Sequence, residues 1–552
     1  MISRTRFWIF IGLILLVYLA GMFVTLIEYD SAQFAVMAMR MVQENDFINL
    51  FKGPEEYLDK PHLHYWLAAL SFKIFGIHDW AYRIPAILVT LLGGWSCYGL
   101  GNALYNRDAG KIAALIFLSA QTIVLSVIDV RTDAVLTGFT VFALWQLLLY
   151  LQQKTLGNIV LGALGAGLAF STKGQIALVV IALPLLCYLA YTRKWKMLLD
   201  WRVLVALGVF ALTITPMLYA YYQQFDLHPE KVIRGKANRS GFRFIFWEQS
   251  FERLSGEGVG RNSSDYFFFF HTFLWVFLPW TVIGISAFGS RIKRVFKSRF
   301  KMGQGVEVLT IGGISLIFLL ISFAQFKLPH YLNITIPLFA VLSGAYLVYL
   351  KKSRRENLLK VFRNVQYGIF ALCFVVAALL TQWVFESENI LVGNFYLAFI
   401  LVAVYFAVVR KPVLSRIISV GVLSSVLLNL VMNISFYPSL LKYEAGATIA
   451  DVVSEKSIPA DRIYKIAPHP SWALDFYNRK PVKITNLDKV EQMNDVWVYA
   501  TDEDLDALKE KGLLWEEQYT ADQFRITRLQ ARFLNPDTRR EVLRKRHLIH
   551  LK

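Results

Sequence analysis

Charged residues are scarce in this chain. Only 18% of its 552 residues are Asp, Glu, Lys or Arg, whereas soluble globular proteins carry about 25%. Apolar residues take their place: they make up 56% of the chain and fall into long runs. Runs of about 18 or more apolar residues are typical of membrane-spanning helices, because the bilayer core needs about 20 residues of helix. The composition therefore indicates an integral membrane protein.

Cysteine is almost absent. The three cysteines, Cys97, Cys187 and Cys373, each lie inside an apolar run. The sequence contains no CxxC pair and no Cys/His spacing of the kind that holds zinc. We therefore expect neither a disulfide framework nor a structural zinc site, and we expect the three thiols to be buried within membrane helices.

Acidic residues are outnumbered, with 40 Asp and Glu against 58 Lys and Arg, which gives a net charge of +18. In a soluble protein this excess would favour a nucleic-acid partner. Here many of the basic residues stand at the ends of apolar runs, where they report membrane topology and contacts with anionic headgroups. We expect membrane lipids as neighbours and no nucleic acid.

The apolar runs predict a polytopic helical protein with about thirteen spans. The predicted spans are 7–27, 84–104, 109–128, 134–152, 156–171, 174–192, 201–223, 266–289, 306–325, 329–350, 361–384, 392–409 and 413–436. Alternate loops are short and basic, and they contain Lys154, Arg193, Lys301, Arg354 and Arg410, among others. By the positive-inside rule these loops and the N-terminus are cytoplasmic. The first run lacks a small-residue cleavage site, so we expect an uncleaved anchor.

Three longer segments fall on the outer side of the membrane: 28–83, 225–265 and 437–552. In the first, 32–42 and 64–75 have helical apolar spacing and are expected to lie in the interface. The last is predicted to be a small soluble α/β domain. Its expected elements are strands at 462–467 and 495–500, a helix at 502–512 and one or two strands within 512–529. Residues 1–436 then form the transmembrane domain.

Asp30 directly follows the first span. A carboxylate at this boundary is suited to act as a general base on an acceptor hydroxyl, or to hold a metal or an amine. The alternative is a solvated interfacial acid.

The motif Asp59-Lys60-Pro61-His62-Leu63-His64 precedes the second predicted interfacial helix. Lys60, next to a rigid proline, is well placed to bind a lipid phosphate as a point charge. Asp59, His62 and His64 are candidate ligands of a divalent metal ion. The alternative is a polar loop with aromatic anchors.

Two acids flank one arginine in the turn Asp129-Val130-Arg131-Thr132-Asp133. Asp133 is a candidate acid of an extracytoplasmic site. The alternative is a helix cap, with Asp133 in the first turn of its helix and Arg131 as its partner.

Two more outer turns carry a lysine, although the positive-inside rule favours none there. They are Ser171-Thr172-Lys173-Gly174 and Lys327-Leu328-Pro329-His330-Tyr331. Snorkelling at a span end is the alternative explanation. The loop 225–265 is also basic and suggests an anionic ligand such as a lipid phosphate, or else general contact with headgroups. Its cations include Arg234, Arg243, Arg253 and Arg261.

These motifs occur together in one order along the chain: an acid after the first span, an acid-Lys-Pro motif near a Tyr-Trp pair, an acid between the third and fourth spans, a Thr-Lys-Gly turn and a Lys-Leu-Pro-x-Tyr turn. The combination resembles the GT-C glycosyltransferases, in the branch of bacterial aminoarabinose transferases (ArnT-like) and protein mannosyltransferases. The motif match covers residues 7–345. The resemblance implies a GT-C fold of about thirteen helices with a soluble C-terminal domain.

The resemblance also implies residue roles. Asp30 matches the first-loop catalytic acid, Asp133 a further acid of the cavity, and Lys60 a contact to the donor phosphate. Asp59 matches the neighbouring acidic position, for which the resemblance implies a candidate metal ligand. Lys173, Arg234, Arg243, Lys327 and Tyr331 are further candidates for donor-phosphate binding. The sequence departs from the family at Asp30-Ser31, where members often carry Asp-Glu, so the second carboxylate is missing here.

The function implied is inverting transfer of a sugar from undecaprenyl phosphate to an extracytoplasmic acceptor, either lipid A, another envelope glycan or a protein. The inserted lumenal domain of protein mannosyltransferases is not visible here, which favours lipid A or a glycan. We expect a bacterial inner-membrane protein with its N-terminus in the cytoplasm and its C-terminus in the periplasm. A lipid or solute transporter is the alternative from another class, but inverted repeats and broken midplane helices are not evident in the sequence. A structural or assembly protein would have no use for acids and lysines on several outer turns.

Overall fold

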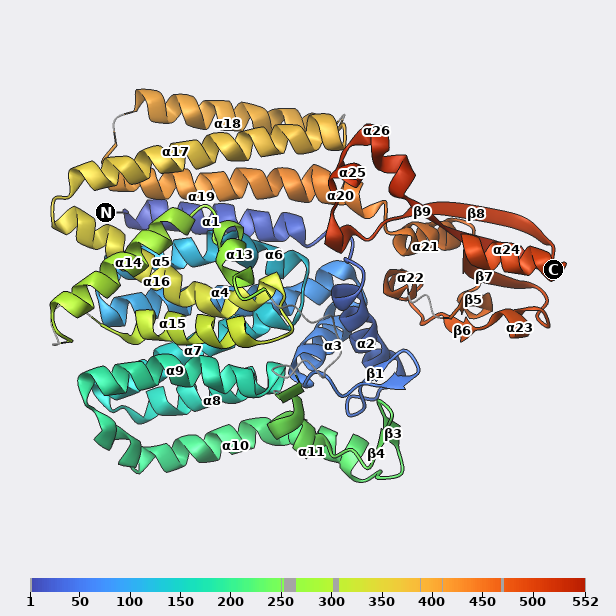
Figure 1. The fold of residues 1–552 in the computed structure, drawn as a ribbon, viewed down its shortest axis with the longest axis horizontal. Helices are drawn as coiled ribbons and strands as arrows, with labels where there is room; N and C mark the ends of the chain where they lie inside the picture. Colours follow the sequence, from blue (N-terminus) through green and yellow to red (C-terminus); the bar gives the residue numbers. More distant parts are fainter. Residues whose placement is uncertain are drawn as a thin grey trace.

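The computed structural model describes residues 2–249, 251–252, 265–300, 307–387, 389–409, 411–467 and 471–551. Four cations named above, Arg253, Arg261, Lys301 and Arg410, lie outside these ranges. The chain forms a bundle of roughly parallel and antiparallel helices with a smaller mixed domain at one end, and the N-terminus lies toward the opposite end (Figure 1).

Within the described residues, ten helices are long and apolar enough to cross a membrane, some of them together with a short flanking turn. They are α1 (Arg4–Gly21), α4 (Asp79–Leu104), α7 (Thr132–Gln153), α8 (Leu156–Lys173), α9 (Gln175–Thr192), α10 (Arg202–Tyr221), α16 (Ile336–Lys352), α17 (Glu356–Leu379), α18 (Ile390–Val408) and α19 (Val413–Val431). An eleventh span is formed if α5 (Arg107–Ser119) and α6 (Gln121–Ile128), which meet at a bend of 51°, are taken together.

The predicted thirteen spans exceed this number at two places. Segment 266–289 divides into α13 (Phe268–Val276) and α14 (Thr281–Lys297) around Pro279, because proline lacks the N–H that a continuous helix needs. Segment 306–325 forms α15 (Leu309–Phe323), which has only 15 residues. At about 1.5 Å per residue such a helix is shorter than the bilayer core.

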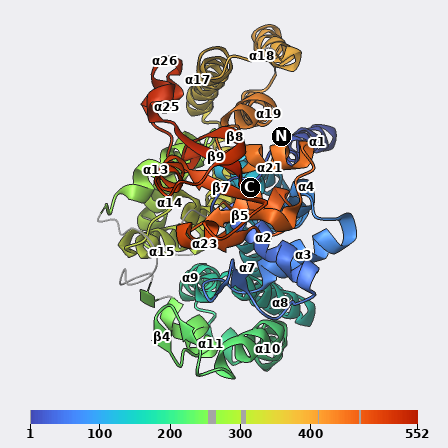
Figure 2. The same cartoon turned by 90° about the vertical axis from the view of Figure 1, so that its right-hand side faces the viewer.

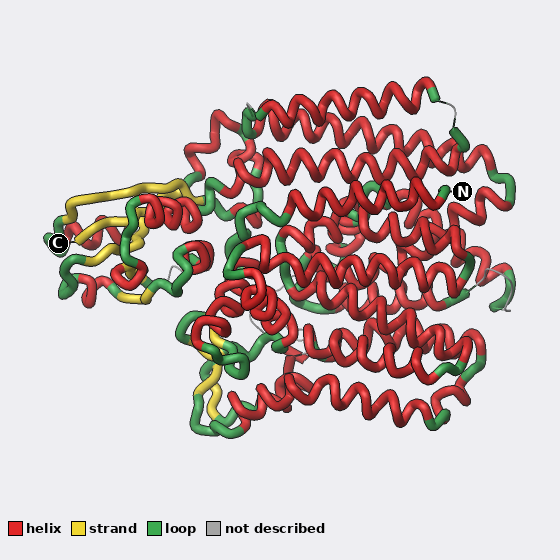
Figure 3. Tube along the Cα trace, turned by 180° about the vertical axis from the view of Figure 1, so that it is seen from behind, coloured by secondary structure: helices red, strands yellow, loops and turns green. Residues whose placement is uncertain are grey.

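The elements at the domain-bearing end of the bundle come mainly from segments 28–83 and 225–265, the two loops predicted to lie on the outer side (Figure 3). The first loop contains α2 (Asp30–Glu44), a hairpin of β1 (Phe51–Lys52) and β2 (Glu55–Glu56), and α3 (Leu63–Phe75). The helices expected at 32–42 and 64–75 are thus present. The second loop begins with the hairpin of β3 (Val232–Ile233) and β4 (Lys236–Ala237), followed by α11 (Gly241–Arg243).

The C-terminal domain is built on a five-stranded mixed sheet with the order β6-β5-β7-β9-β8. The strands are β5 (Ile463–Ile466), β6 (Lys483–Thr485), β7 (Val496–Thr501), β8 (Trp515–Gln523) and β9 (Arg544–Leu551). The predicted strands at 462–467 and 495–500 and the predicted helix at 502–512 correspond to β5, β7 and α24 (Asp502–Glu510). The short edge strand β6 and the last strand, β9, were not expected. Strand β9 lies between β7 and β8 and is antiparallel to both.

The domain also contains α21 (Ala445–Glu455), α22 (Trp472–Tyr477) and α23 (Leu487–Val490), and it sits over the end of the bundle (Figure 2). Buried Glu28, just before α2, joins the two parts: its carboxylate accepts hydrogen bonds from the backbone N–H groups of Trp472 (2.6 Å) and Ala473 (3.1 Å). Its own N–H donates to Glu444 Oε2 at 2.9 Å. These bonds fix the C-terminal domain beside the residue that opens α2, Asp30.

Candidate active site

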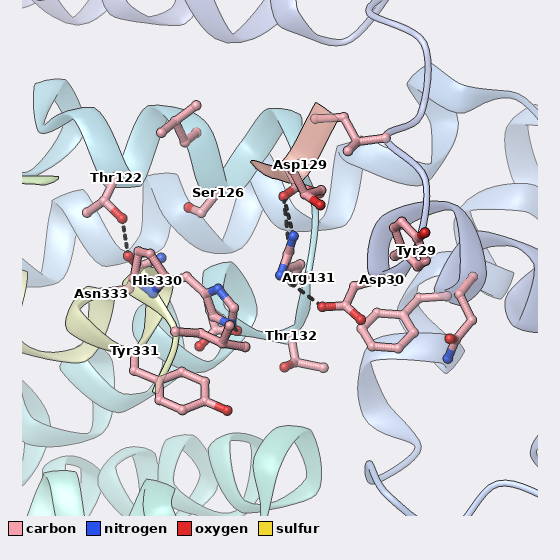
Figure 4. Close-up of a pocket in the computed structure, with 18 of the residues that line it drawn as sticks. Tyr29, Asp30, Thr122, Ser126, Asp129, Arg131, Thr132, His330, Tyr331 and Asn333 are labelled. Atoms are coloured by element: carbon pink, nitrogen blue, oxygen red, sulfur yellow. Dashed lines mark hydrogen bonds and ion pairs between the residues drawn. The ribbon is translucent and has the colours of Figure 1, made fainter. Parts of the chain in front are cut away.

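A cavity of about 1240 Å³ lies where the bundle meets the C-terminal domain. Its wall is assembled from segments far apart in the sequence (Figure 4). They include the start of α2, the loop before α3, α6 and the α6–α7 turn, the end of α8, residues 326–331 before α16, residues 432–440 after α19, and residues 525–529 after β8. The site candidates on this wall are Asp30, Asp59, Lys60, Asp133, Lys173, Lys327 and Tyr331.

One charge cluster is centred on Arg131. Its guanidinium binds Asp30 Oδ2 at 2.8 Å and Asp129 Oδ2 at 2.8 Å. Burial lowers the pKa of Arg131, but the two carboxylates outweigh burial and raise it above its ordinary range, so the cation is permanent. Asp30 is the first residue of α2, its side chain is 44% exposed, and its second oxygen has no partner among the residues that the structure describes. Asp30 is therefore an oriented acid with one oxygen open to the cavity.

A second cluster is centred on Asp133, which is buried in the first turn of α7. Lys173, the last residue of α8, binds Asp133 Oδ1 at 2.7 Å, and its ammonium lies 4.6 Å from the centre of the Tyr331 ring. His330 Nε2 lies 3.7 Å from Asp133 Oδ2. Three predicted site residues from separate turns thus meet here, and Asp133 balances the charge of Lys173.

Lys60 and Lys327 also line the cavity. The side chain of Lys327 is buried, and burial lowers the pKa of its ammonium. Because the positive charge is poorly solvated there, an anion in the cavity is a favourable partner for it.

The basic loop is only partly at the cavity. Arg234 forms an ion pair with Asp59, one of the wall residues, and with Glu252 at 3.2 Å. Arg243 binds Glu248 at 3.1 Å and is 75% exposed. Neither arginine is part of the described cavity wall. The arrangement therefore gives neither arginine a place on the wall from which to contact a phosphate in the cavity, and Arg234 instead holds the wall residue Asp59.

The proposed metal ligands do not come together. His62 Nε2 binds the Ile48 carbonyl at 2.8 Å, and His64 Nε2 binds the Tyr82 hydroxyl at 3.0 Å. Both rings are buried, and burial lowers the pKa of each to about 4, so they are neutral side chains of the loop core. Across the described ranges, no three His, Cys, Asp or Glu side chains form a possible metal site. The donor set of Asp59, His62 and His64 therefore does not fit a metal ion.

Sequence reasoning missed the wall segment 525–529, which carries Arg525 and Arg528. No local pattern distinguishes it from a polar loop, since only the docking of the C-terminal domain brings it to the cavity. Asp129 and Arg131 were recognised as a charged turn, but their link to Asp30 across 101 positions of the chain is visible only in the structure.

Parts of this chain are similar in sequence to known proteins. The model of the family described as dolichyl-phosphate-mannose-protein mannosyltransferase matches residues 59–219. An undecaprenyl phosphate-α-4-amino-4-deoxy-L-arabinose arabinosyl transferase of Proteus mirabilis is 26% identical over 64% of this chain and 61% of its own length. The corresponding transferase of Pseudomonas aeruginosa UCBPP-PA14 is 26% identical over 58% of this chain and 55% of its own length. The aligned regions thus span about three fifths of these curated relatives.

The fold agrees over almost the whole chain with a solved structure. ArnT from Cupriavidus metallidurans, crystallised with undecaprenyl phosphate, superposes with a TM-score of 0.74 at 18% identity and covers 99% of this chain and 98% of its own. Its apo form gives a TM-score of 0.73. The chain therefore has an ArnT-like fold, with a bundle of candidate membrane spans and a C-terminal mixed-sheet domain, and its sequence is similar to the arabinosyl transferases and to the mannosyltransferase family model.

Proposed function

We propose that this protein is an inverting glycosyltransferase that moves a sugar from a polyprenyl phosphate, of the undecaprenyl class, to an anionic glycolipid such as lipid A on the periplasmic side of a bacterial inner membrane. The names of the curated relatives support the donor and the reaction type, and so does the lipid phosphate in the related crystal structure.

The observation that carries the proposal is the setting of Asp30. One of its oxygens is held by Arg131, and the other is open to a cavity that several cations line. Such an acid can orient an acceptor hydroxyl and take its proton, while the cations stabilise an anionic leaving group.

In the proposed step, the acceptor oxygen attacks the anomeric carbon from the face opposite the lipid phosphate. The new carbon–oxygen bond forms as the bond to the phosphate oxygen breaks, and the phosphate leaves with the electron pair. Asp30 orients the acceptor and receives its proton. Lys60 and Lys327 are assigned to the charge of the departing phosphate, with Lys173 and Tyr331 behind them on the same wall.

If the acceptor atom belongs to a phosphate, little base strength is required, and positioning then supplies most of the rate. The pairing of Asp30 with Arg131 suits this case, because the 2.8 Å ion pair holds the carboxylate in a fixed position at the cavity.

The test is transfer of labelled sugar from membrane polyprenyl-phosphate donors to the lipid A fraction by the purified protein. The Asp30→Asn variant should lose transfer by about 10²-fold or more, because a positioned acid–base group contributes about 10²–10⁴-fold. Asp46→Asn, at an acid of the same loop that does not line the cavity, is the matched control.

Normal turnover by Asp30→Asn would refute the role of Asp30. Label in protein in place of lipid A would keep the reaction and replace the acceptor, as in a protein mannosyltransferase. A wild-type protein that consumes no donor would refute the enzyme and favour a transporter.

A further inference from the structure

The wall segment 525–529 belongs to the C-terminal domain, yet it lines the same cavity as Asp30. The Arg525 guanidinium lies over the ring of Tyr29, 5.1 Å from its centre, and Tyr29 directly precedes Asp30. Arg525 is therefore on the Asp30 side of the cavity.

This segment is firmly anchored. The N–H of Phe524 donates to the Tyr443 carbonyl at 2.8 Å, and the Phe524 ring stacks on Phe533 at 3.9 Å between ring centres. The side chain of Ile526 is buried within the main apolar core. Between these anchors, the backbone of η8 (Ile526–Arg528) holds Arg525 and Arg528 at the wall, and both arginines remain exposed.

The acids on the cavity wall are already paired, which decides whether they can bind Arg525 and Arg528. Each wall acid already has a basic partner: Asp30 and Asp129 share Arg131, and the other pairs are Asp133 with Lys173, Asp59 with Arg234, and Asp265 with His271. Arg525 and Arg528 form no ion pair with a carboxylate in the described parts of the chain. Two exposed guanidinium groups without a carboxylate partner among the described residues, beside acids that are already paired, favour an anionic ligand.

We propose that Arg525 and Arg528 form an acceptor subsite that binds a phosphate group of the acceptor glycolipid, so that the C-terminal domain is part of the substrate-binding cavity. The planar guanidinium matches phosphate oxygens through paired hydrogen bonds. The Asp30 side of the cavity is where the proposed function places the acceptor, whereas Lys60 and Lys327 are assigned to the donor phosphate. This inference rests on the proposed function.

The experiment compares the full-length protein with the double variant Arg525→Gln/Arg528→Gln. Transfer of labelled sugar is measured with bisphosphorylated lipid A and with chemically dephosphorylated lipid A as acceptors. The control is Arg540→Gln/Arg544→Gln, two exposed arginines of the same domain that are not on the cavity wall. Binding of undecaprenyl phosphate is measured on every preparation.

For the phosphorylated acceptor, the kcat/KM of the double variant should fall about tenfold, chiefly because KM rises. A tenfold loss corresponds to about 1.4 kcal/mol of binding free energy. Its kcat/KM for the dephosphorylated acceptor should equal that of the wild type, and the control should match the wild type with both acceptors. An equal loss with both acceptors, or no loss, would overturn the subsite. Weakened binding of undecaprenyl phosphate would assign the arginines to the donor and also overturn it. If the wild type transfers no sugar at all, the proposed function itself is refuted. Failure of the proposed function can thus be told apart from failure of the arginine subsite.

Discussion

Charged side chains around the cavity are arranged as ion pairs that differ in exposure. Arg131 and its two acids are partly open, with Asp30 44% exposed, whereas Asp133 and Lys173 are only 4% and 13% exposed. An ion pair removed from water is costly to break, because the remaining charge has no compensating partner. The two clusters should therefore respond differently to mutation: Asp30 through activity, and the Asp133–Lys173 pair through stability.

The Lys173→Met variant leaves the Asp133 carboxylate without its 2.7 Å partner. We expect it to lose about 3 kcal/mol of stability, and the double variant Asp133→Asn/Lys173→Met to lose clearly less, because no unpaired charge remains. Thermal unfolding in detergent micelles measures both. Lys297→Met, at the exposed last residue of α14, serves as the control. Equal losses in the single and double variants would show that the pair is not coupled.

At the scale of elements, the C-terminal domain is attached through two buried acids, Glu28 and Glu444. Burial raises the pKa of Glu28 to about 7, although hydrogen bonds from the N–H groups of Trp472 and Ala473 oppose the shift. Burial, followed by the charge of Glu28, raises the pKa of Glu444 well above its ordinary range. The docked state thus retains a proton that these acids would release in water, so docking is sensitive to pH.

Since the folded pKa of Glu28 is raised, this acid favours docking below its ordinary pKa near 4.5, and that contribution is lost as the pH rises through about 7. Glu444→Gln keeps an oxygen acceptor for the Glu28 N–H and removes one buried charge. Its stability relative to the wild type should rise between pH 5 and pH 8, by on the order of 1 kcal/mol. Thermal unfolding across this pH range measures the difference, with Glu510→Gln, at an exposed acid, as the control. A difference that stays flat with pH would contradict this account.

At the scale of the whole molecule, the short hairpins and the C-terminal domain lie at one end of the bundle, away from the N-terminus (Figures 1 and 3). The segments that line the cavity include the start of α2 and residues 525–529 of the C-terminal domain, so the cavity is at the same end. The basic loops predict that the opposite end faces the cytoplasm. The proposed acceptor is on the outer side of the membrane, so the proposed function requires the cavity to face the periplasm.

Single cysteines test this orientation in intact spheroplasts with a membrane-impermeant maleimide. Glu55→Cys, at an exposed position of β2, should react at once, whereas Lys154→Cys, at the exposed turn after α7, should react only after permeabilisation. The native cysteines lie within α4, α9 and α17, which keeps the background low. Immediate labelling at position 154 would reverse the proposed topology.

Among the described residues, the sequence by itself determined the membrane class, eleven of the thirteen predicted span segments if the bent pair α5–α6 counts as one, both helices of loop 28–83 and most of the C-terminal elements. Hydropathy, charge and periodicity are local properties, so a single segment displays them. The other two segments, 266–289 and 306–325, were predicted as spans but do not form single long helices. Pro279 interrupts the first, and the second forms a helix of only 15 residues.

The tertiary structure decided the site. In it, Asp30 forms an ion pair with Arg131, and Lys173 forms one with Asp133. His62 and His64 bind other groups of the loop core and not a common metal position. Arg525, from the far end of the chain, lies beside Tyr29 at the cavity. A residue type indicates which chemistry is available. Which charges neutralise one another, and which stay open to a ligand, depends on distances between segments that no local pattern contains.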